Sequence, residues 1–321
     1  SHLSALAKSR TFEPAVIYGR NKERISFLAN KFDLIAADSL EEILDGHNVS
    51  LVDISTSNDL HYSYALAALQ AGISVIVEKP AAFTSSNVET LVDEAKKRDL
   101  MVSICFQKRF NKSFKRVLSF LAKGDQGTFL HGETNVFMPR KSSYYKSKWH
   151  NSVELAGGGV LIYHAIHDLD LLCLLLGKVK SIDGEIQNTY HSTEVEDTVH
   201  LIMNFGSGGT HHFHASTDPG HTPRIETRMV FENGTLSFND IGHKWSRYKE
   251  PVLKVRSYAG NSLKSRILDR FYGLGNYRDI LGDMGSFFSK KTDNVTSKLA
   301  TAVETHRVIE TFYNQARKIE S

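Results

Sequence analysis

The stretch "VSLVDISTSNDLHYSYALAALQAGISVIVEKP", residues 49–80, decides the fold of this chain. It opens with a continuous apolar run at residues 49–56, which is typical of a strand buried on both faces. An amphipathic segment at residues 59–72 follows and ends at a glycine, a common stop for a helix. A second apolar run covers residues 74–80 and closes on a proline. The stretch therefore predicts a strand, a helix and a parallel strand.

The same alternation continues on both sides. The short β-branched run "AVIY" (15–18) precedes a segment with helical spacing, and a capped helical segment at residues 84–99 precedes the apolar run "LMVSICF" (100–106). This pattern predicts an α/β domain with a parallel sheet covered by helices on both faces. Because ligands of such sheets bind beyond the carboxyl ends of the strands, the polar residues found there are the candidates. They are Gly19, Arg20, Asn21, Thr56, Ser57, Asn58, Glu78, Lys79, Pro80 and residues 107–110.

The pattern changes from about residue 127. Six segments alternate apolar and polar residues, and Gly, Asn and Asp turns separate them; "GSGG" (206–209) and "ENGT" (232–235) are hairpin signals. We predict an α+β domain with a large, mostly antiparallel sheet, and place the domains at residues 1–124 and 125–321. The chain ends in helical pattern, and its last helices are candidates to pack back on the first domain.

Composition excludes several classes of function. The 321 residues carry a net charge of +3 and show no block of like charge, so neither nucleic acid nor a membrane surface is an expected partner. We find no apolar run of membrane-spanning length and no signal peptide, which together favour a cytoplasmic protein. Cys105 and Cys173 lie in apolar surroundings and are expected to be buried free thiols.

The stretch "GGGVLIYHAIHDLD" (157–170) gathers more potential catalytic or metal-binding side chains than any other, and a helix is expected over residues 160–177. Its three glycines allow a backbone or a ligand to approach closely. His167 can share a helical face with Tyr163 and His164, and Asp170 is placed to hydrogen-bond His167 and fix its tautomer.

A metal site is one interpretation of this stretch, with ligands from His164, His167 and Asp168 or Asp170. The spacing is not that of a zinc protease, whose general-base glutamate is also missing, so we predict no metal. The run "HHFH" (211–214) offers no better site, because neighbours in a strand point to opposite faces. The alternative is an acid–base helix in which a carboxylate holds a neutral histidine.

These residues resemble those of a known family. "TSNDLHYSYALAALQAGISVIVEKP" followed by "GGGVLIYHAIHDLDLLCLLLG" resembles the Gfo/Idh/MocA oxidoreductases, and the similarity extends to "EVEDTVHLIMNF" and "MVFENGTLSF". The resemblance implies a Rossmann domain that binds NAD or NADP. It also implies a large-sheet domain that supplies the substrate pocket and the contacts of a homodimer or homotetramer. The implied reaction moves a hydride between the nicotinamide and a carbinol carbon of a sugar, cyclitol or nucleotide sugar.

The resemblance also implies roles for single residues. Lys79 matches the active-site lysine, Pro80 follows a cis bond, and His167 matches the catalytic histidine that takes and gives the proton. Further positions match the surroundings of the nicotinamide or support the helix; they are Thr56, Ser57, Asn58 and His61 beside the ribose, Glu78 and Arg109 near the nicotinamide end, and Asp170 behind the helix.

Two departures from the family pattern stand out. Tyr163 occupies the position where the family has an aspartate or an asparagine, and a phenol can relay or orient but does not carry a negative charge near neutral pH. The glycine-rich GxGxxG loop is also missing. We expect it, with the first strand, upstream of Ser1. A cofactor-binding sensor or scaffold without catalysis is therefore the alternative function, and a metal-dependent lyase or hydrolase comes third.

Two further segments indicate which cofactor and which substrate the protein binds. Gly19-Arg20-Asn21 occupies the place where an acidic residue usually binds the ribose of NAD. An arginine there favours NADP slightly, because it can bind the 2′-phosphate, and NAD remains an open alternative. Residues 144–162 resemble members that oxidise UDP-N-acetyl-hexosaminuronates at C3. Lys148, Trp149, Tyr163 and His164 would then line the sugar pocket together with Lys79 and His167.

Overall fold

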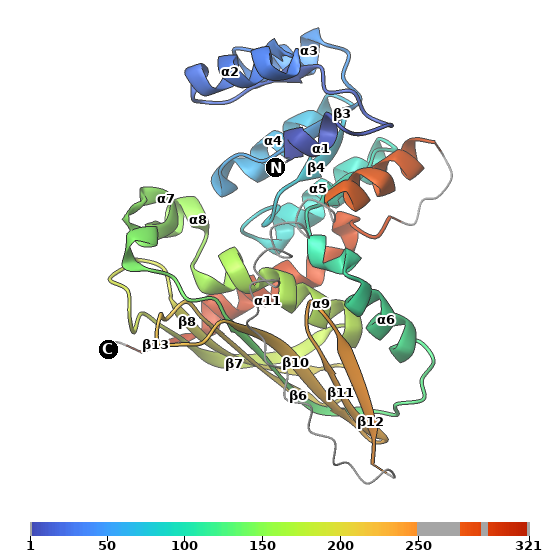
Figure 1. Cartoon of the computed structure of the whole chain (residues 1–321), viewed down its shortest axis with the longest axis vertical. Coiled ribbons are helices and arrows are strands. Elements are labelled where there is room, and N and C mark those ends of the chain that lie inside the picture. Colours follow the sequence, from blue (N-terminus) through green and yellow to red (C-terminus); the bar gives the residue numbers. More distant parts are fainter. Residues whose placement is uncertain (1, 249–276, 290–294, 320–321) are drawn as a thin grey trace. The chain divides into compact units, whose positions relative to one another are not determined.

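The computed structural model describes residues 2–248, 277–289 and 295–319 (Figure 1). The described residues form two compact units. The first holds residues 2–82, 86–107, 277–289 and 295–301, and the second holds residues 83–85, 108–248 and 302–319.

The first unit alternates strands and helices, as predicted. Its β3, β4 and β5 form one parallel sheet and β1 and β2 form another, and every residue of β4 is buried. A strand buried on both faces carries apolar residues on both of them, which is why Val75, Ile76 and Val77 show no alternation, while the buried Ser74 hydroxyl accepts from the N–H of Met101. The elements are α1 (His2–Leu6), β1 (Val16–Ile17), α2 (Lys22–Phe32), β2 (Ile35–Ala36), α3 (Leu40–Gly46), β3 (Leu51–Ile54), α4 (Asn58–Gln70), β4 (Ser74–Val77), α5 (Ser85–Lys97), β5 (Val102–Ile104) and helical residues 277–288.

The second unit is built on an eight-stranded sheet in the order β12-β11-β10-β6-β9-β8-β7-β13. The pairs β6–β9 and β7–β13 are parallel and the others are antiparallel, which confirms the mostly antiparallel sheet. Its strands are β6 (Phe129–Phe137), β7 (Val179–Gln187), β8 (Thr198–Phe205), β9 (Thr210–Ser216), β10 (Arg224–Phe231), β11 (Gly234–Phe238), β12 (His243–Arg247) and β13 (Arg317–Ile319).

Helices cover one face of this sheet. In Figure 1, α9 and α11 lie over its strands, and α11 packs against both β7 and α9. Along β9, His211 and Phe213 are buried while His212 is exposed, so neighbouring histidines point to opposite faces, as predicted. The helical elements are η1 (Gln107–Phe110), α6 (Lys112–Leu121), η2 (Ser142–Lys146), α7 (Lys148–Asn151), α8 (Val153–Ala156), η3 (Leu161–Ala165), α9 (Ile166–Leu176), η4 (Leu299–Ala302) and α11 (Val303–Gln315).

The division between the units differs from the predicted one near residue 124. It falls between residues 107 and 108, because α6 buries Phe114 and Val117 and packs against α9 and β11 of the second unit. The expectation for the last helices was correct only in part. Residues 277–289 belong to the first unit, whereas α11 belongs to the second.

The expectation that the chain has no apolar run of membrane-spanning length was wrong for one helical stretch. The helical stretch Val153–Leu176 has a mean hydropathy of 1.6 over its most apolar window and is long enough to cross a membrane by length and composition. In the structure 72% of that window is buried inside the protein, as in the core helix of a globular domain.

Candidate functional site

The first unit gathers its candidate residues at the carboxyl ends of β3 and β4. His61, on the first turn of α4, is 1% exposed; its Nδ1 lies 2.7 Å from the carbonyl oxygen of Pro80 and its Nε2 lies 3.2 Å from that of Thr56. The peptide bond between Lys79 and Pro80 is cis, as expected. His61 thus ties the loop after β3 to the loop after β4. Burial lowers the pKa of its imidazole, against the two carbonyl contacts, and the neutral ring can donate its one N–H to only one of the two carbonyls at a time.

Lys79 follows Glu78 directly after β4, and its backbone N–H donates to the Glu78 carboxylate at 3.0 Å. Burial lowers the pKa of the Lys79 ammonium, against the opposing charge of Glu78. Burial alone would raise the pKa of Glu78, but the hydrogen bond and charge of His2 and the charge of Lys79 outweigh it and hold that pKa at about 2. The strand end therefore presents an ionised carboxylate beside a lysine that gives up its proton more readily than usual.

His2 joins this network from α1. It bridges Glu78 and Asp53 at 2.9 Å each, stacks on Tyr277 and has its pKa raised to about 10; burial opposes this shift, but the two carboxylates overcome it. His2, Glu78 and Cys105 have ligand atoms within 4.8 Å of one another, the one such group in the described part of the chain. Both ring nitrogens of His2 are already engaged by carboxylates, Nδ1 by Asp53 and Nε2 by Glu78, and burial raises the pKa of the Cys105 thiol.

The loop after β1 carries Gly19, Arg20 and Asn21. Arg20 Nη2 donates to Ser57 Oγ at 3.2 Å, so the structure brings these two candidates together. Asn21 Oδ1 accepts from the backbone N–H of Arg24 and caps α2. Ser57, the N-cap residue of α4, makes no side-chain cap to its own helix. A helix N-terminus without a side-chain cap beside polar strand ends suits a nucleotide, so these residues fit a nicotinamide cofactor.

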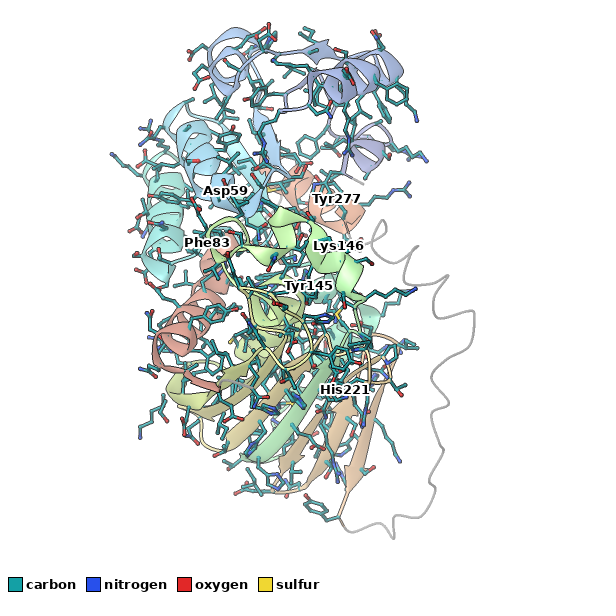
Figure 2. The ribbon with its side chains drawn as sticks, turned by 90° about the vertical axis from the view of Figure 1, so that its left-hand side faces the viewer. Asp59, Phe83, Tyr145, Lys146, His221 and Tyr277 are labelled. Atoms are coloured by element: carbon teal, nitrogen blue, oxygen red, sulfur yellow. The ribbon has the colours of Figure 1, made fainter. Side chains whose placement is uncertain are left out.

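The glycines at 157–159 are explained by packing within the second unit. Gly157 has φ +82°, and a Cβ there would meet the ring of Phe83, which is labelled in Figure 2. A Cβ at Gly159 would overlap the backbone oxygen of Glu196. The glycines therefore admit neighbouring protein groups, which is the backbone approach that the sequence allowed.

Glu196 holds the start of the helix that follows these glycines. Its buried carboxylate accepts from the backbone N–H groups of Gly159 (2.7 Å) and Leu161 (3.1 Å) and from the hydroxyl of Tyr313 (2.8 Å). The sequence analysis missed this residue, and the signal was available: "EVED" places acids just before a buried strand. The helix begins with a π-helical turn, η3, and continues as α9 to Gly177, which agrees with the predicted span.

Tyr163, His164 and His167 are half-buried, whereas the seven other residues between 161 and 170 are buried. The structure thus brings these three predicted site residues to one open face of the helix. Trp149 Nε1 donates to Tyr163 Oη at 3.1 Å, so Trp149 joins them. Lys148 begins α7, and its side chain lies outside the described residues.

Arg109 and Asp170 have a different setting from the expected one. Arg109 belongs to the second unit and forms a two-bond ion pair with Asp170, at 2.7 and 2.6 Å, in which the side chains are 1% and 0% exposed. Asp170 also accepts from Thr305 at 3.1 Å. The Asp170 carboxylate is therefore engaged by Arg109 and Thr305, and its predicted bond to His167 is replaced by these contacts.

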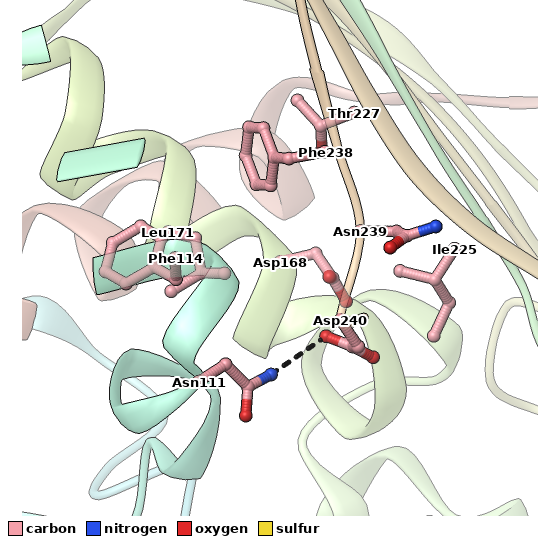
Figure 3. Close-up of a pocket in the computed structure, with 9 residues that line it drawn as sticks. All are labelled: Asn111, Phe114, Asp168, Leu171, Ile225, Thr227, Phe238, Asn239 and Asp240. Atoms are coloured by element: carbon pink, nitrogen blue, oxygen red, sulfur yellow. Dashed lines mark hydrogen bonds between the residues drawn. The ribbon is translucent and has the colours of Figure 1, made fainter. Parts of the chain in front are cut away.

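A second ionic cluster surrounds Asp168, two residues before Asp170. Lys108 Nζ donates to both oxygens of Asp168, at 2.8 and 3.0 Å, and lies 3.3 Å from Asp240. Asp240 also accepts from Asn111, the bond drawn in Figure 3. Burial alone lowers the pKa of Lys108, but the two carboxylates outweigh it and raise that pKa. The adjoining pocket, lined also by Phe114, Leu171 and Phe238, has an interior volume of about 10 Å³, room for about one water. Asp168 is thus engaged in an ion pair.

Comparison with protein families places both units. The model described as "Oxidoreductase family, NAD-binding Rossmann fold" matches residues 1–106, and the "GFO/IDH/MocA C-terminal domain" matches residues 114–237. The gap between the two matches contains the division between the units at residue 107.

Two curated relatives illustrate the sequence similarity. The scyllo-inositol 2-dehydrogenase (NADP(+)) IolW of Bacillus subtilis is 25% identical over 60% of this chain, which spans 53% of that enzyme's length. Oxidoreductase P35 of Formosa agariphila is 23% identical over 73% of this chain and 74% of its own. The chain therefore matches about half to three quarters of these relatives.

Solved structures share the fold over almost the whole chain. The WlbA dehydrogenase from Bordetella pertussis, in complex with NADH and UDP-GlcNAcA, has a TM-score of 0.86 at 20% identity and covers 98% of this chain and 91% of its own. Levoglucosan dehydrogenase, in complex with NADH and levoglucosan, has a TM-score of 0.79 at 19% identity, with coverages of 98% and 93%. With a parallel α/β unit, a large antiparallel-sheet unit and a matching model for each, the chain belongs to the Gfo/Idh/MocA oxidoreductase family.

Proposed function

We propose that this protein is a nicotinamide-dependent oxidoreductase that acts on a CH–OH group of a sugar, cyclitol or nucleotide sugar. The observation that carries the proposal is Lys79, a lysine with a lowered pKa beside a cis proline at the end of β4, within the part of the chain that matches the NAD-binding model. A lysine of this kind can donate a hydrogen bond to a developing alkoxide and stabilise its negative charge.

The chain's own residues supply the proton chemistry. His167 takes the hydroxyl proton when the substrate is oxidised and returns it on reduction. Lys79 hydrogen-bonds the same oxygen and stabilises the negative charge that develops there. Tyr163, held by Trp149, orients the substrate. When bound, the nicotinamide accepts or supplies the hydride.

Around these groups, the other candidate residues hold the cofactor. Thr56, Ser57 and Asn58 would contact the nicotinamide ribose, with Glu78 at the nicotinamide end, and the buried His61 would act through the loops of Thr56 and Pro80 that it contacts. Arg20 would lie beside the adenosine ribose, where its guanidinium favours NADP slightly over NAD. Arg109, which the sequence assigned to the nicotinamide end, acts in this proposal through the loop that it anchors to Asp170.

A UDP-N-acetyl-hexosaminuronate is the proposed substrate, with Lys148, Trp149 and His164 lining the sugar pocket. The resemblance of residues 144–162 supports this choice, and WlbA, of the same fold, was crystallised with UDP-GlcNAcA. We also propose a cytoplasmic homodimer or homotetramer that associates through the open face of the large sheet. Light scattering at several protein concentrations tests the association, and a monomer at all of them contradicts it.

The function is tested with Lys79→Met and His167→Asn in the full-length protein. Each should lower kcat by about 10²–10⁴-fold, the usual contribution of a general acid–base group, with an unchanged circular dichroism spectrum. Asp59→Asn, an exposed change on α4, is the control that should keep wild-type turnover. Cofactor binding without turnover of any sugar in the wild type would instead support the sensor or scaffold.

A further inference from the structure

His2 bridges two carboxylates on neighbouring strands of the parallel sheet in the first unit. Its Nδ1 lies 2.9 Å from Oδ1 of Asp53, which belongs to β3, and its Nε2 lies 2.9 Å from Oε1 of Glu78, which follows β4. Ionised carboxylates only accept hydrogen bonds, so both ring nitrogens must donate to them. Because only the imidazolium form carries two N–H groups, the bridge requires His2 to be a cation.

The surroundings of His2 support this bridge. The ring of Tyr277, labelled in Figure 2, stacks on the His2 ring with centroids 3.9 Å apart, and its hydroxyl donates to Asp53 Oδ2 at 2.6 Å. Gln107 Nε2 donates to Glu78 Oε1 at 3.4 Å. Burial alone would lower the pKa of His2, but the hydrogen bonds and charges of Asp53 and Glu78 raise it to about 10. The bridge therefore keeps its charge at neutral pH.

Glu78 connects the bridge to the turn that carries Lys79. While Oε1 of Glu78 is engaged by His2, its Oε2 accepts from the backbone N–H of Lys79 at 3.0 Å. On the other side of Lys79, the carbonyl oxygen of Pro80 lies 2.7 Å from Nδ1 of His61. The backbone before and after Lys79 is thus held by two histidines, His2 through Glu78 and His61 directly.

The charge of Glu78 depends on the same bridge. Burial alone would raise the pKa of this carboxyl, but the hydrogen bond and charge of His2, with the charge of Lys79, hold it at about 2. Without His2 the buried carboxylate loses a charged partner, so its pKa rises and the bond that orients it is gone. A small displacement of a catalytic group lowers the rate steeply, because the reacting atoms must be aligned.

We propose that His2 is a positioning residue, whose imidazolium bridges Asp53 and Glu78 and thereby fixes the turn that presents Lys79. The proposal rests on the proposed function, in which Lys79 stabilises the developing alkoxide. Because that negative charge develops in the transition state, loss of His2 should lower kcat while sugar binding stays nearly unchanged.

The test combines truncation with chemical rescue in the full-length protein. His2→Ala should lower kcat by about 10- to 100-fold, the range for a lost hydrogen bond between charged groups, and should change the KM of the sugar by less than about threefold. The His2 side chain is 17% exposed, so free imidazole has access to the vacated place. Added imidazole should therefore raise the kcat of His2→Ala in a saturable way and leave that of the wild type unchanged.

His47→Ala is the matched control. This histidine of the first unit precedes β3, its Nε2 lies 3.7 Å from the Glu42 carboxylate, and its side chain is 18% exposed. The variant should keep the kcat of the wild type and show no response to imidazole. His2→Gln is a second variant of the bridge, which can bond one carboxylate but carries no charge. It should show the same fall in kcat with an unchanged circular dichroism spectrum.

NMR of the imidazole nitrogens adds a measurement that needs no substrate. The signals of His2 are identified by their absence in His2→Gln. In the wild type both nitrogens of His2 should stay protonated from about pH 6 to 9, whereas an ordinary histidine loses a proton near pH 6.5. This measurement and His2→Gln decide the matter if His2→Ala does not fold.

Three results would overturn the proposal: wild-type kcat in the His2 variants, a fall in the kcat of folded His2→Ala that imidazole does not reverse, and deprotonation of His2 near pH 6.5. Failure of the proposed function gives a different result. If the wild type oxidises no sugar or cyclitol, the oxidoreductase assignment fails and the positioning role fails with it. If the wild type turns over and the His2 variants do so equally well, only the positioning role fails.

Discussion

Among single residues, Arg109 forms a fully buried ion pair, with its side chain 1% exposed. Its guanidinium is buried against Asp170 and joins the loop after β5 to α9. Arg109→Met leaves the Asp170 charge buried with Thr305 alone, so we expect the free energy of unfolding to fall by about 3–5 kcal/mol in urea titrations.

Arg224→Met provides the comparison, because Arg224 pairs with Glu226 while 54% and 39% of these side chains are exposed. A pair of this kind contributes at most about 1 kcal/mol. Equal losses in the two variants would contradict the role given to Arg109.

His211 and His212 are neighbours with opposite burial and test the pH dependence of stability. Burial, with the charge of His212, lowers the pKa of His211 from 6.5 to about 3. Below pH 6.5 the unfolded chain therefore binds a proton that the folded chain does not, and stability falls as pH drops from about 6.5 toward 3.

His211→Gln should reduce the slope of the free energy of unfolding against pH by about 1.4 kcal/mol per pH unit, the contribution of one proton. Urea titrations between pH 6.5 and 4 measure this slope. His212→Gln removes the smaller of the two causes, so burial still keeps the pKa of His211 low and a slope of about one proton should remain. The same slope in wild type and His211→Gln would show that His211 does not contribute.

At the scale of the element, the turn η3 depends on close packing at its start. Gly159 has no room for a Cβ, because the backbone oxygen of Glu196 occupies that place. Gly159→Ala should push Glu196 away from the helix N-terminus and destabilise the unit by about 1–3 kcal/mol or more, measured as a lower Tm.

Gly242→Ala is the matched change, since nothing lies within 4 Å of the added Cβ and the backbone is not left-handed. We expect its Tm to stay within about a degree or two of wild type. Two variants of similar stability would mean that the Glu196 contact does not restrict position 159.

An element could be predicted where neighbouring residues determine it, and could not be predicted where contacts with distant residues determine it. The helix through His167 and its stop at Gly177 follow from spacing and a glycine, which are local signals. The partners of Asp170 and Asp168 are Arg109 and Lys108 of η1, 61 and 60 residues away, and Thr305 of α11, 135 residues from Asp170. A single sequence gives no distance between such positions, which is why the predicted hydrogen bond between Asp170 and His167 was wrong.

On the scale of the whole molecule, the two-unit division shows the same limit. The change from strand–helix alternation to an antiparallel sheet indicated two domains, and both are present. The predicted division at 124 was wrong because α6 is amphipathic and its apolar face fits either unit by composition; contacts with α9 and β11 decide the matter. The return of residues 277–289 to the first unit likewise has no local signal.

The central claim is hydride transfer to or from a sugar carbon with His167 and Lys79 handling the proton. Its most direct test is the reduction of NAD⁺ or NADP⁺ by the full-length protein with a panel of acidic sugars, nucleotide sugars and cyclitols, followed by reduced-nicotinamide absorbance. We predict turnover with at least one of these substrates, lost by about 10²-fold or more in both His167→Asn and Lys79→Met. Wild-type rates in both variants, or no turnover by a protein that binds the cofactor, would contradict the account.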